Sequence, residues 1–135
     1  MSLPSTVAPV ALALPFAPSS AAVARAQLRD WLVELGQPGE VIDDSRLVLS
    51  ELVGNAVRHA KPLADGTVHV AWNRDATGLD LAVTDGGAPT VPHPVKAGTS
   101  ALAGRGLEIV SQLSNRWWLE TTRSRSTVHA LVRLT

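Results

Sequence analysis

This sequence contains no cysteine among its 135 residues, and aromatic residues make up only 4% of it. The absence of cysteine excludes disulfide bonds, thiolate metal sites and cysteine-based catalysis. It is compatible with a reducing compartment, so we expect a cytoplasmic protein. An excess of charge is also absent, since 12 acidic residues balance 12 basic ones. Without an overall basic field we expect no direct contact with nucleic acid, and any anion site must be local.

A long hydrophobic run is lacking as well. The apolar segment Val7–Phe16 is too short to span a bilayer, contains Pro9 and Pro15, and has no Lys or Arg before it, which argues against a signal peptide. We therefore expect no membrane contact and interpret Val10–Phe16 as an edge strand, where proline near the ends is tolerated. With 45% hydrophobic residues the chain can bury a real core, and we expect one domain over residues 1–135.

Hydrophobic periodicity predicts the remaining elements. Apolar residues at helical spacing predict three helices: Ala21–Leu35, Val41 to between His59 and Lys61, and Leu107–Leu113. Alternating residues predict four more strands: Thr67–Trp72, Leu79–Thr84, Asn115–Thr121 and Thr127–Leu134, with turns at Asn73–Gly78 and Thr122–Ser126. Asp85–Ser100 is rich in glycine and proline and is predicted to be a loop. The order predicts an α+β two-layer sandwich, with three helices on one face of a mainly antiparallel sheet.

The second predicted helix carries polar residues within an apolar pattern. Glu51 and Asn55 are four residues apart, which places a carboxylate and a carboxamide on one helical face, beside Arg58 and His59. Such a face can coordinate a metal, position a water and hold an anion. The same spacing fits a solvated polar stripe equally well, and this segment alone does not decide between the two.

Two glycine-containing segments follow. Asp85-Gly86-Gly87 ends a strand with an acid and two residues that let the backbone approach a ligand closely, although Asp-Gly alone more often marks a turn. Gly104-Arg105-Gly106 opens a helix, where free amides favour a phosphate. It lacks the lysine of a P-loop and the preceding strand of a Rossmann turn. The order of the three features is more specific than any one of them.

That order resembles the Bergerat-fold ATPases, which include DNA gyrase, heat-shock chaperone ATPases, mismatch-repair ATPases and histidine kinases. Within this superfamily the chain is most similar to the small bacterial anti-sigma-factor serine/threonine kinases. The segments that carry the resemblance are Ser50–Ala60, Val83–Pro89, Gly104–Val110 and Ser126–Val128. The resemblance covers essentially the whole chain from Pro15.

The resemblance implies a role for individual residues toward ATP and Mg²⁺. Glu51 matches the general base, Asn55 the Mg²⁺ ligand, and Asp85 the carboxylate that accepts a hydrogen bond from the adenine amino group, with Gly87 leaving room for the base. Thr127 matches the strand threonine near adenine. The residues that match phosphate contacts are Arg58, Gly104, Arg105, Gly106 and Leu107.

The resemblance implies an ATP-dependent kinase that phosphorylates an anti-sigma-factor antagonist and otherwise sequesters a sigma factor. It also suggests a homodimer formed through the first strand and first helix, although the sequence itself leaves the oligomeric state open. Two departures from the family favour an alternative. Asp85–Pro89 lacks the later glycine of many relatives, and the segment between it and Gly104 is short and contains proline. That alternative is a non-catalytic nucleotide-sensing module that sequesters a partner. A small α+β domain without nucleotide is the third reading.

Overall fold

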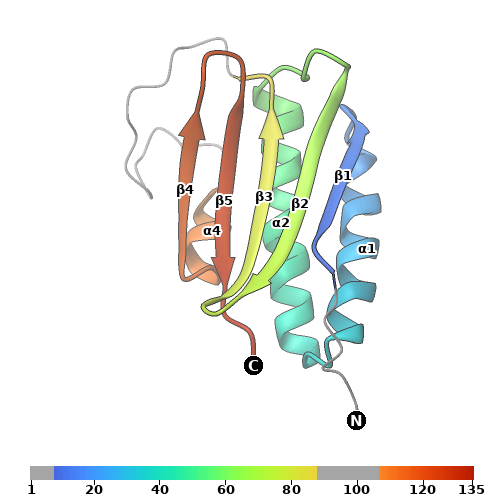
Figure 1. Cartoon of the computed structure of the whole chain (residues 1–135), viewed down its shortest axis with the longest axis vertical. Helices are drawn as coiled ribbons and strands as arrows, with labels where there is room; N and C mark the ends of the chain where they lie inside the picture. The colour runs from blue at the N-terminus through green and yellow to red at the C-terminus, as the bar shows by residue number, and fades with distance from the viewer. Residues whose placement is uncertain (1–7, 88–106) are drawn as a thin grey trace.

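A computed structural model describes residues 8–87 and 107–135. Within these ranges the helices are α1 (Ser20–Glu34), α2 (Gly39–His59) and α4 (Glu108–Leu113). The strands are β1 (Val10–Pro15), β2 (Thr67–Asp75), β3 (Gly78–Asp85), β4 (Arg116–Thr121) and β5 (Ser126–Val132) (Figure 1). None of the helices in these ranges is long and apolar enough to cross a membrane.

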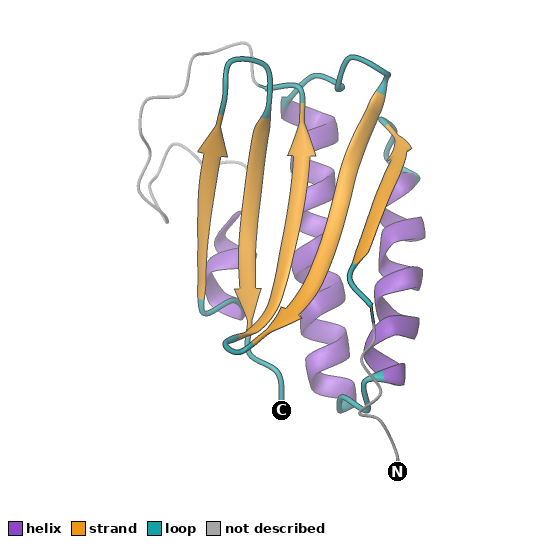
Figure 2. Cartoon of the chain, viewed as in Figure 1, coloured by secondary structure: helices purple, strands orange, loops and turns teal. Residues whose placement is uncertain are grey.

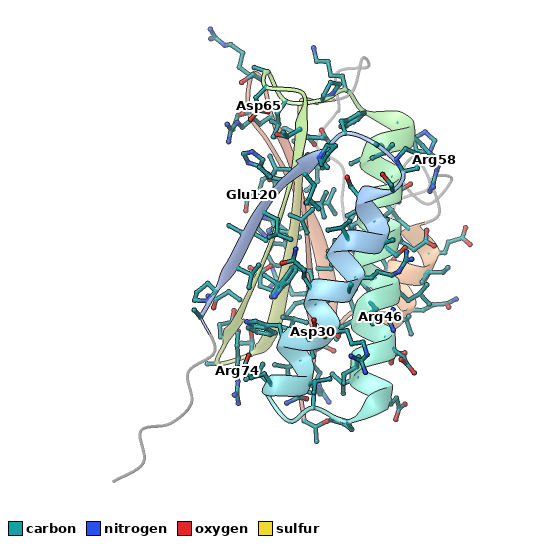
Figure 3. All side chains as sticks on the ribbon, turned by 90° about the vertical axis from the view of Figure 1, so that its right-hand side faces the viewer. Asp30, Arg46, Arg58, Asp65, Arg74 and Glu120 are labelled. Carbon is teal, nitrogen blue, oxygen red and sulfur yellow. The ribbon has the colours of Figure 1, made fainter. Side chains whose placement is uncertain are left out.

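The strands form one antiparallel sheet in the order β1-β2-β3-β5-β4. All helices within the described ranges lie on one face of this sheet, with α2 between α1 and α4 (Figure 2). The turned view shows the sheet and the helices as two layers (Figure 3). This arrangement confirms the predicted α+β sandwich and the position of the first strand at an edge.

The core lies between the sheet and α2, and the sequence pattern explains its composition. Alternate residues of β3 are buried: Leu79, Leu81 and Val83 face the helices. From α2 the inward face supplies Val48, Leu49, Leu52, Val53 and Ala56, which recur at helical spacing. Glu51 and Asn55 belong to a different face of α2 from these core residues, and this offset leaves both available for a site beside the core.

The β2–β3 hairpin differs from the prediction. The sequence indicated a turn over residues 73–78, but β2 continues to Asp75 and only two residues separate the strands. Asp75 Oδ1 accepts hydrogen bonds from the N–H groups of Thr77 and Gly78, at 2.7 and 3.1 Å. The carboxylate thus satisfies the N–H groups of the tight turn, and β2 can extend as far as Asp75.

The C-terminal residue is held at the junction of α1 and α2. The side-chain amide of Gln37 donates to the Thr135 carbonyl at 3.0 Å, and its oxygen accepts from the Thr135 N–H at 2.9 Å. The C-terminus therefore lies at the end of the molecule opposite the α2–β2 connection (Figure 1).

Candidate functional site

Asn55 is the most unusual polar residue of α2. Both polar atoms of its side chain, Oδ1 and Nδ2, are buried without a hydrogen-bond partner among the described residues. Single unpaired atoms occur at Ser45, Arg46 and Trp72, but only at Asn55 does a whole amide group lack partners within that part of the chain. Buried polar groups are nearly always satisfied, so this amide is a candidate ligand-binding group.

A cation at Asn55 would need ligands other than the side chains of the described residues. No group of three or more His, Asp or Glu side chains in the described ranges could hold a metal by itself. Mg²⁺ is commonly bound in this way, through one or two protein oxygens together with waters and substrate phosphates. The Asn55 carbonyl oxygen therefore fits Mg²⁺ that arrives with a nucleotide.

Glu51 lies one turn before Asn55 and borders a pocket. The pocket has a volume of about 190 Å³ and lies between the start of α1 and the second half of α2. Its lining residues are Pro18, Ala21, Ser50, Glu51, Gly54, Val57 and Arg58. The structure thus brings Glu51 and Arg58 together at one opening, whereas Asn55 does not line it.

Arg58 folds back along α2. A Cβ atom placed on Gly54 would lie only 2.8 Å from the Arg58 Nη1 atom, so the absence of a side chain at Gly54 makes room for the guanidinium. Arg58 is exposed on the helix side of the molecule (Figure 3). The pocket therefore has a carboxylate and a guanidinium at its edge and a lining of mixed polar and apolar character.

Asp85 ends β3 and is only 7% exposed. Its Oδ1 atom accepts a hydrogen bond from the Gly87 N–H at 2.7 Å. This local turn needs a backbone with a φ of 94° at Gly87, a conformation that glycine adopts at little cost. The predicted pair of Asp85 and Gly87 is thus brought together.

Backbone hydrogen bonds connect this turn to the end of α2. The Gly86 N–H donates to the Lys61 carbonyl at 2.8 Å, and the Lys61 N–H donates to the Gly87 carbonyl at 3.1 Å. The helix that carries Glu51 and the strand that carries Asp85 therefore meet at their C-terminal ends.

Thr127 is not brought together with Asp85. It pairs with Thr84 across the β3–β5 ladder, and their hydroxyl groups are 2.8 Å apart. Since neighbouring residues of a strand point to opposite faces, Thr127 faces away from the side that Asp85 shares with Val83 and the helices. The residue paired with Asp85 is Ser126.

The second glycine-containing segment is described only at its end. Gly104, Arg105 and Gly106 lie outside the described residues, as does most of the predicted loop. Leu107 precedes α4, and its side chain is 3% exposed within the core. The predicted helix over residues 107–113 is thus observed as α4, which begins one residue later than predicted.

Sequence reasoning missed three parts of this region. The pocket residue Pro18 comes from the turn before α1 and Ala21 from α1 itself, and both are far from Glu51 in sequence. Lys61 contributes through its backbone, which leaves no residue signature. Ser126 was signalled by its place next to Thr127, but only the ladder register shows which of the two faces the helices.

Comparisons with known proteins agree with this geometry. The protein-family profile described as "Histidine kinase-like ATPase domain" matches residues 14–134. Among solved structures, the chain is similar to the RsbU and RsbW domains of Rv1364c from Mycobacterium tuberculosis, with a TM-score of 0.73 and 24% sequence identity. This similarity covers 94% of the present chain and 32% of that chain, so the chain spans about a third of its length. A search of the curated proteins gives no significant match.

Proposed function

This chain belongs to the histidine kinase-like ATPase domain family, and on that premise we propose that it is an ATP-dependent protein serine/threonine kinase. In this proposal the γ-phosphoryl group of ATP passes to a serine or threonine hydroxyl of an anti-sigma-factor antagonist. The products are ADP and the phosphorylated antagonist. ATP binding is in keeping with the family, whereas the regulatory role and the acceptor are our inference.

The observation that carries the proposal is the buried amide of Asn55, which has no hydrogen-bond partner among residues 8–87 and 107–135 and lies on the same helix as Glu51. An unpaired buried amide costs stability, typically about 1–3 kcal/mol, unless a bound group satisfies it. A hydrated Mg²⁺ ion would accept the Asn55 oxygen as a ligand, and a phosphate oxygen or water would accept its N–H groups. When bound, Mg²⁺ would neutralise developing charge on the phosphates.

Adenine recognition is assigned to the end of β3. The Asp85 carboxylate only accepts hydrogen bonds when ionised, so it favours the amino group of adenine over the carbonyl of guanine. Gly87 donates to one of its oxygens and so orients the carboxylate. Ser126 lies opposite in the ladder and could supply a hydroxyl on the same side of the sheet.

The acceptor hydroxyl is assigned to the pocket beside Glu51. A general base must lie within hydrogen-bond reach of the proton that it removes. Glu51 lines the pocket and lies one turn before Asn55 on α2, so a hydroxyl entering the pocket would give its proton to Glu51 as its oxygen bonds to phosphorus. Arg58 at the same opening supports binding of an acceptor segment with backbone or acidic oxygens.

The partners follow from the same proposal. We infer that the unphosphorylated antagonist and a sigma factor compete for this protein in the cytoplasm. The similar structure consists of RsbU and RsbW domains, which supports a place among partner-switching regulators.

The direct test uses γ-labelled ATP, Mg²⁺ and each anti-sigma-factor antagonist encoded in the source genome, purified separately. The proposal expects label on a serine or threonine of at least one antagonist, located by mass spectrometry. Binding of Mg-ATP without transfer to any antagonist would replace this proposal with the non-catalytic sensor. Absence of nucleotide binding would remove both.

A further inference from the structure

The two adjacent glycines after Asp85 are required for different physical reasons. At Gly87 the backbone is left-handed, with a φ of 94°, and a Cβ atom would meet nothing within 4 Å. At Gly86 the φ is ordinary, but a Cβ atom would run into the Pro62 carbonyl group, with the carbonyl carbon at 2.8 Å and the Lys61 oxygen at 3.0 Å. Gly86 is therefore a site of close approach between two segments.

Hydrogen bonds link the close contact at Gly86 to the side chain of Asp85. Lys61 accepts from the Gly86 N–H and donates to the Gly87 carbonyl, at 2.8 and 3.1 Å. The Gly87 N–H in turn donates to Asp85 Oδ1 at 2.7 Å. Three consecutive hydrogen bonds thus connect the exit of α2 to the Asp85 carboxylate. We refer to them, together with the Gly86–Pro62 contact, as the Lys61 bridge.

We propose that Gly86 is a positioning residue for nucleotide base selection, because it lets the Lys61 bridge hold the Asp85 carboxylate at a fixed place relative to α2. This inference rests on the proposed role of Asp85 toward adenine. The bridge connects the element that selects the base with the helix that carries Asn55 and Glu51. The distance between base recognition and phosphate chemistry is thereby set by backbone contacts.

A side chain at Gly86 would move the bridge as a unit. Real Cβ atoms essentially never lie within 3.0 Å of another heavy atom, and the obstructing group here is main chain, which cannot rotate away. Residues 86 and 87 would have to withdraw from Lys61, and Asp85 would follow because Gly87 holds its oxygen. A displacement of about 1 Å is enough to reduce the efficiency of a preorganised site by roughly 10²-fold.

The test measures the affinities for ATP and GTP by calorimetry, together with the free energy of unfolding. In Gly86→Ala, the ratio of ATP affinity to GTP affinity is expected to be at least tenfold lower than in the parent. Gly39→Ala, at the other end of α2, adds a Cβ that meets nothing within 4 Å and is expected to keep the preference. Val132→Ala removes a core side chain that is 4% exposed, and is expected to lower stability without changing the preference.

A second pair of variants opens the bridge from the Lys61 side. Lys61→Pro removes the N–H that binds Gly87 and places its Cδ atom against the Gly87 carbonyl, so it breaks this hydrogen bond without a side chain at Gly86. The preceding Ala60 already has an extended backbone, φ −114° and ψ −172°, as proline requires of its neighbour. Lys61→Ala keeps the N–H and changes only the side chain. We expect Lys61→Pro to lose the preference for ATP and Lys61→Ala to keep it.

The outcomes are distinct. If the parent prefers ATP and both Gly86→Ala and Lys61→Pro keep that preference, the inference is overturned. If Gly86→Ala does not fold, the Lys61 pair decides alone. A parent that binds ATP and GTP equally would instead contradict the proposed role of Asp85, which is a failure of the proposed function.

Discussion

Asp85 and Ser126 lie directly opposite each other in the β3–β5 ladder, on the side of the sheet that the helices cover. Paired residues of an antiparallel ladder point to the same face, with Cβ atoms about 5 Å apart. The next pair, Thr84 and Thr127, points to the other face and is joined through its hydroxyl groups. Two adjacent hydroxyl residues of β5 therefore have separate environments.

These environments predict opposite effects of two alanine substitutions. Ser126→Ala removes a hydroxyl beside Asp85 and is expected to weaken ATP binding while leaving the fold unchanged. Thr127→Ala removes the hydrogen bond to Thr84 and is expected to lower the free energy of unfolding by about 1 kcal/mol, with ATP affinity unchanged. Calorimetry with ATP and denaturant titration of both variants measure the two effects. Weaker binding only in Thr127→Ala would reverse the assignment.

Asp85→Asn tests base recognition without dismantling the turn. The asparagine carbonyl can still accept from the Gly87 N–H, whereas its amide group presents a donor in place of an acceptor. We expect ATP affinity to fall by about 1–3 kcal/mol, because donor faces donor at the adenine amino group. Affinity for GTP is expected to fall less. A folded variant with the parent's ATP affinity would remove Asp85 from the site.

Asn55→Ala separates ligand binding from stability. Deleting a buried amide that makes no hydrogen bond in the described structure is expected to leave the unliganded protein as stable as before, or more stable. The Mg²⁺-dependent part of ATP affinity is expected to disappear, while binding in excess chelator survives. Thermal unfolding with and without Mg-ATP measures both effects. A large loss of stability in the unliganded variant would instead indicate a structural role for this amide.

The stability of the chain at acidic pH depends on two turn carboxylates. Hydrogen bonds from the Thr77 hydroxyl and N–H lower the pKa of Asp75 below its usual 3.8, and the Thr67 hydroxyl does the same for the pKa of Asp65. A lowered folded-state pKa means that this stabilisation is complete above the unfolded value. It is lost as the pH falls through the folded-state pKa.

Replacing both carboxylates should therefore flatten the acid limb of the stability profile. In the Asp65→Asn, Asp75→Asn double variant, the free energy of unfolding is expected to change less steeply below pH 3.8 than in the parent. Denaturant titrations at a series of pH values measure the slope. Identical slopes in the two proteins would show that these turns do not contribute to acid sensitivity.

Much of the fold could be predicted from the sequence because its local signals agree. Gly36 and Pro62 mark the ends of α1 and α2, and alternation in β2 and β3 places the core residues. The hairpin length was mispredicted because Asp75 ends β2 through its own side chain, and turn-forming residues around it suggested a longer turn.

The site was predictable where its residues are close together in sequence. Asp85 and Gly87 form a contact two residues apart, and Glu51 and Asn55 share one helix. The reason for glycine at position 86 lies in Pro62, which is 24 positions earlier in the sequence, and no local pattern reveals that contact. Strand register is also not revealed by local sequence, because a shift of one residue exchanges the sheet face to which each side chain points.

The most direct measurement is phosphoryl transfer by Glu51→Gln. This substitution keeps the size of the side chain and removes its capacity to accept the hydroxyl proton. Glu40→Gln, in the first turn of the same helix and exposed, is the matched control. We expect Glu51→Gln to bind Mg-ATP and the antagonist as the parent does, and to transfer the γ-phosphoryl group about 10²–10⁴-fold more slowly. Transfer by Glu51→Gln at the rate of the parent and of Glu40→Gln would contradict the assignment of Glu51 as the base.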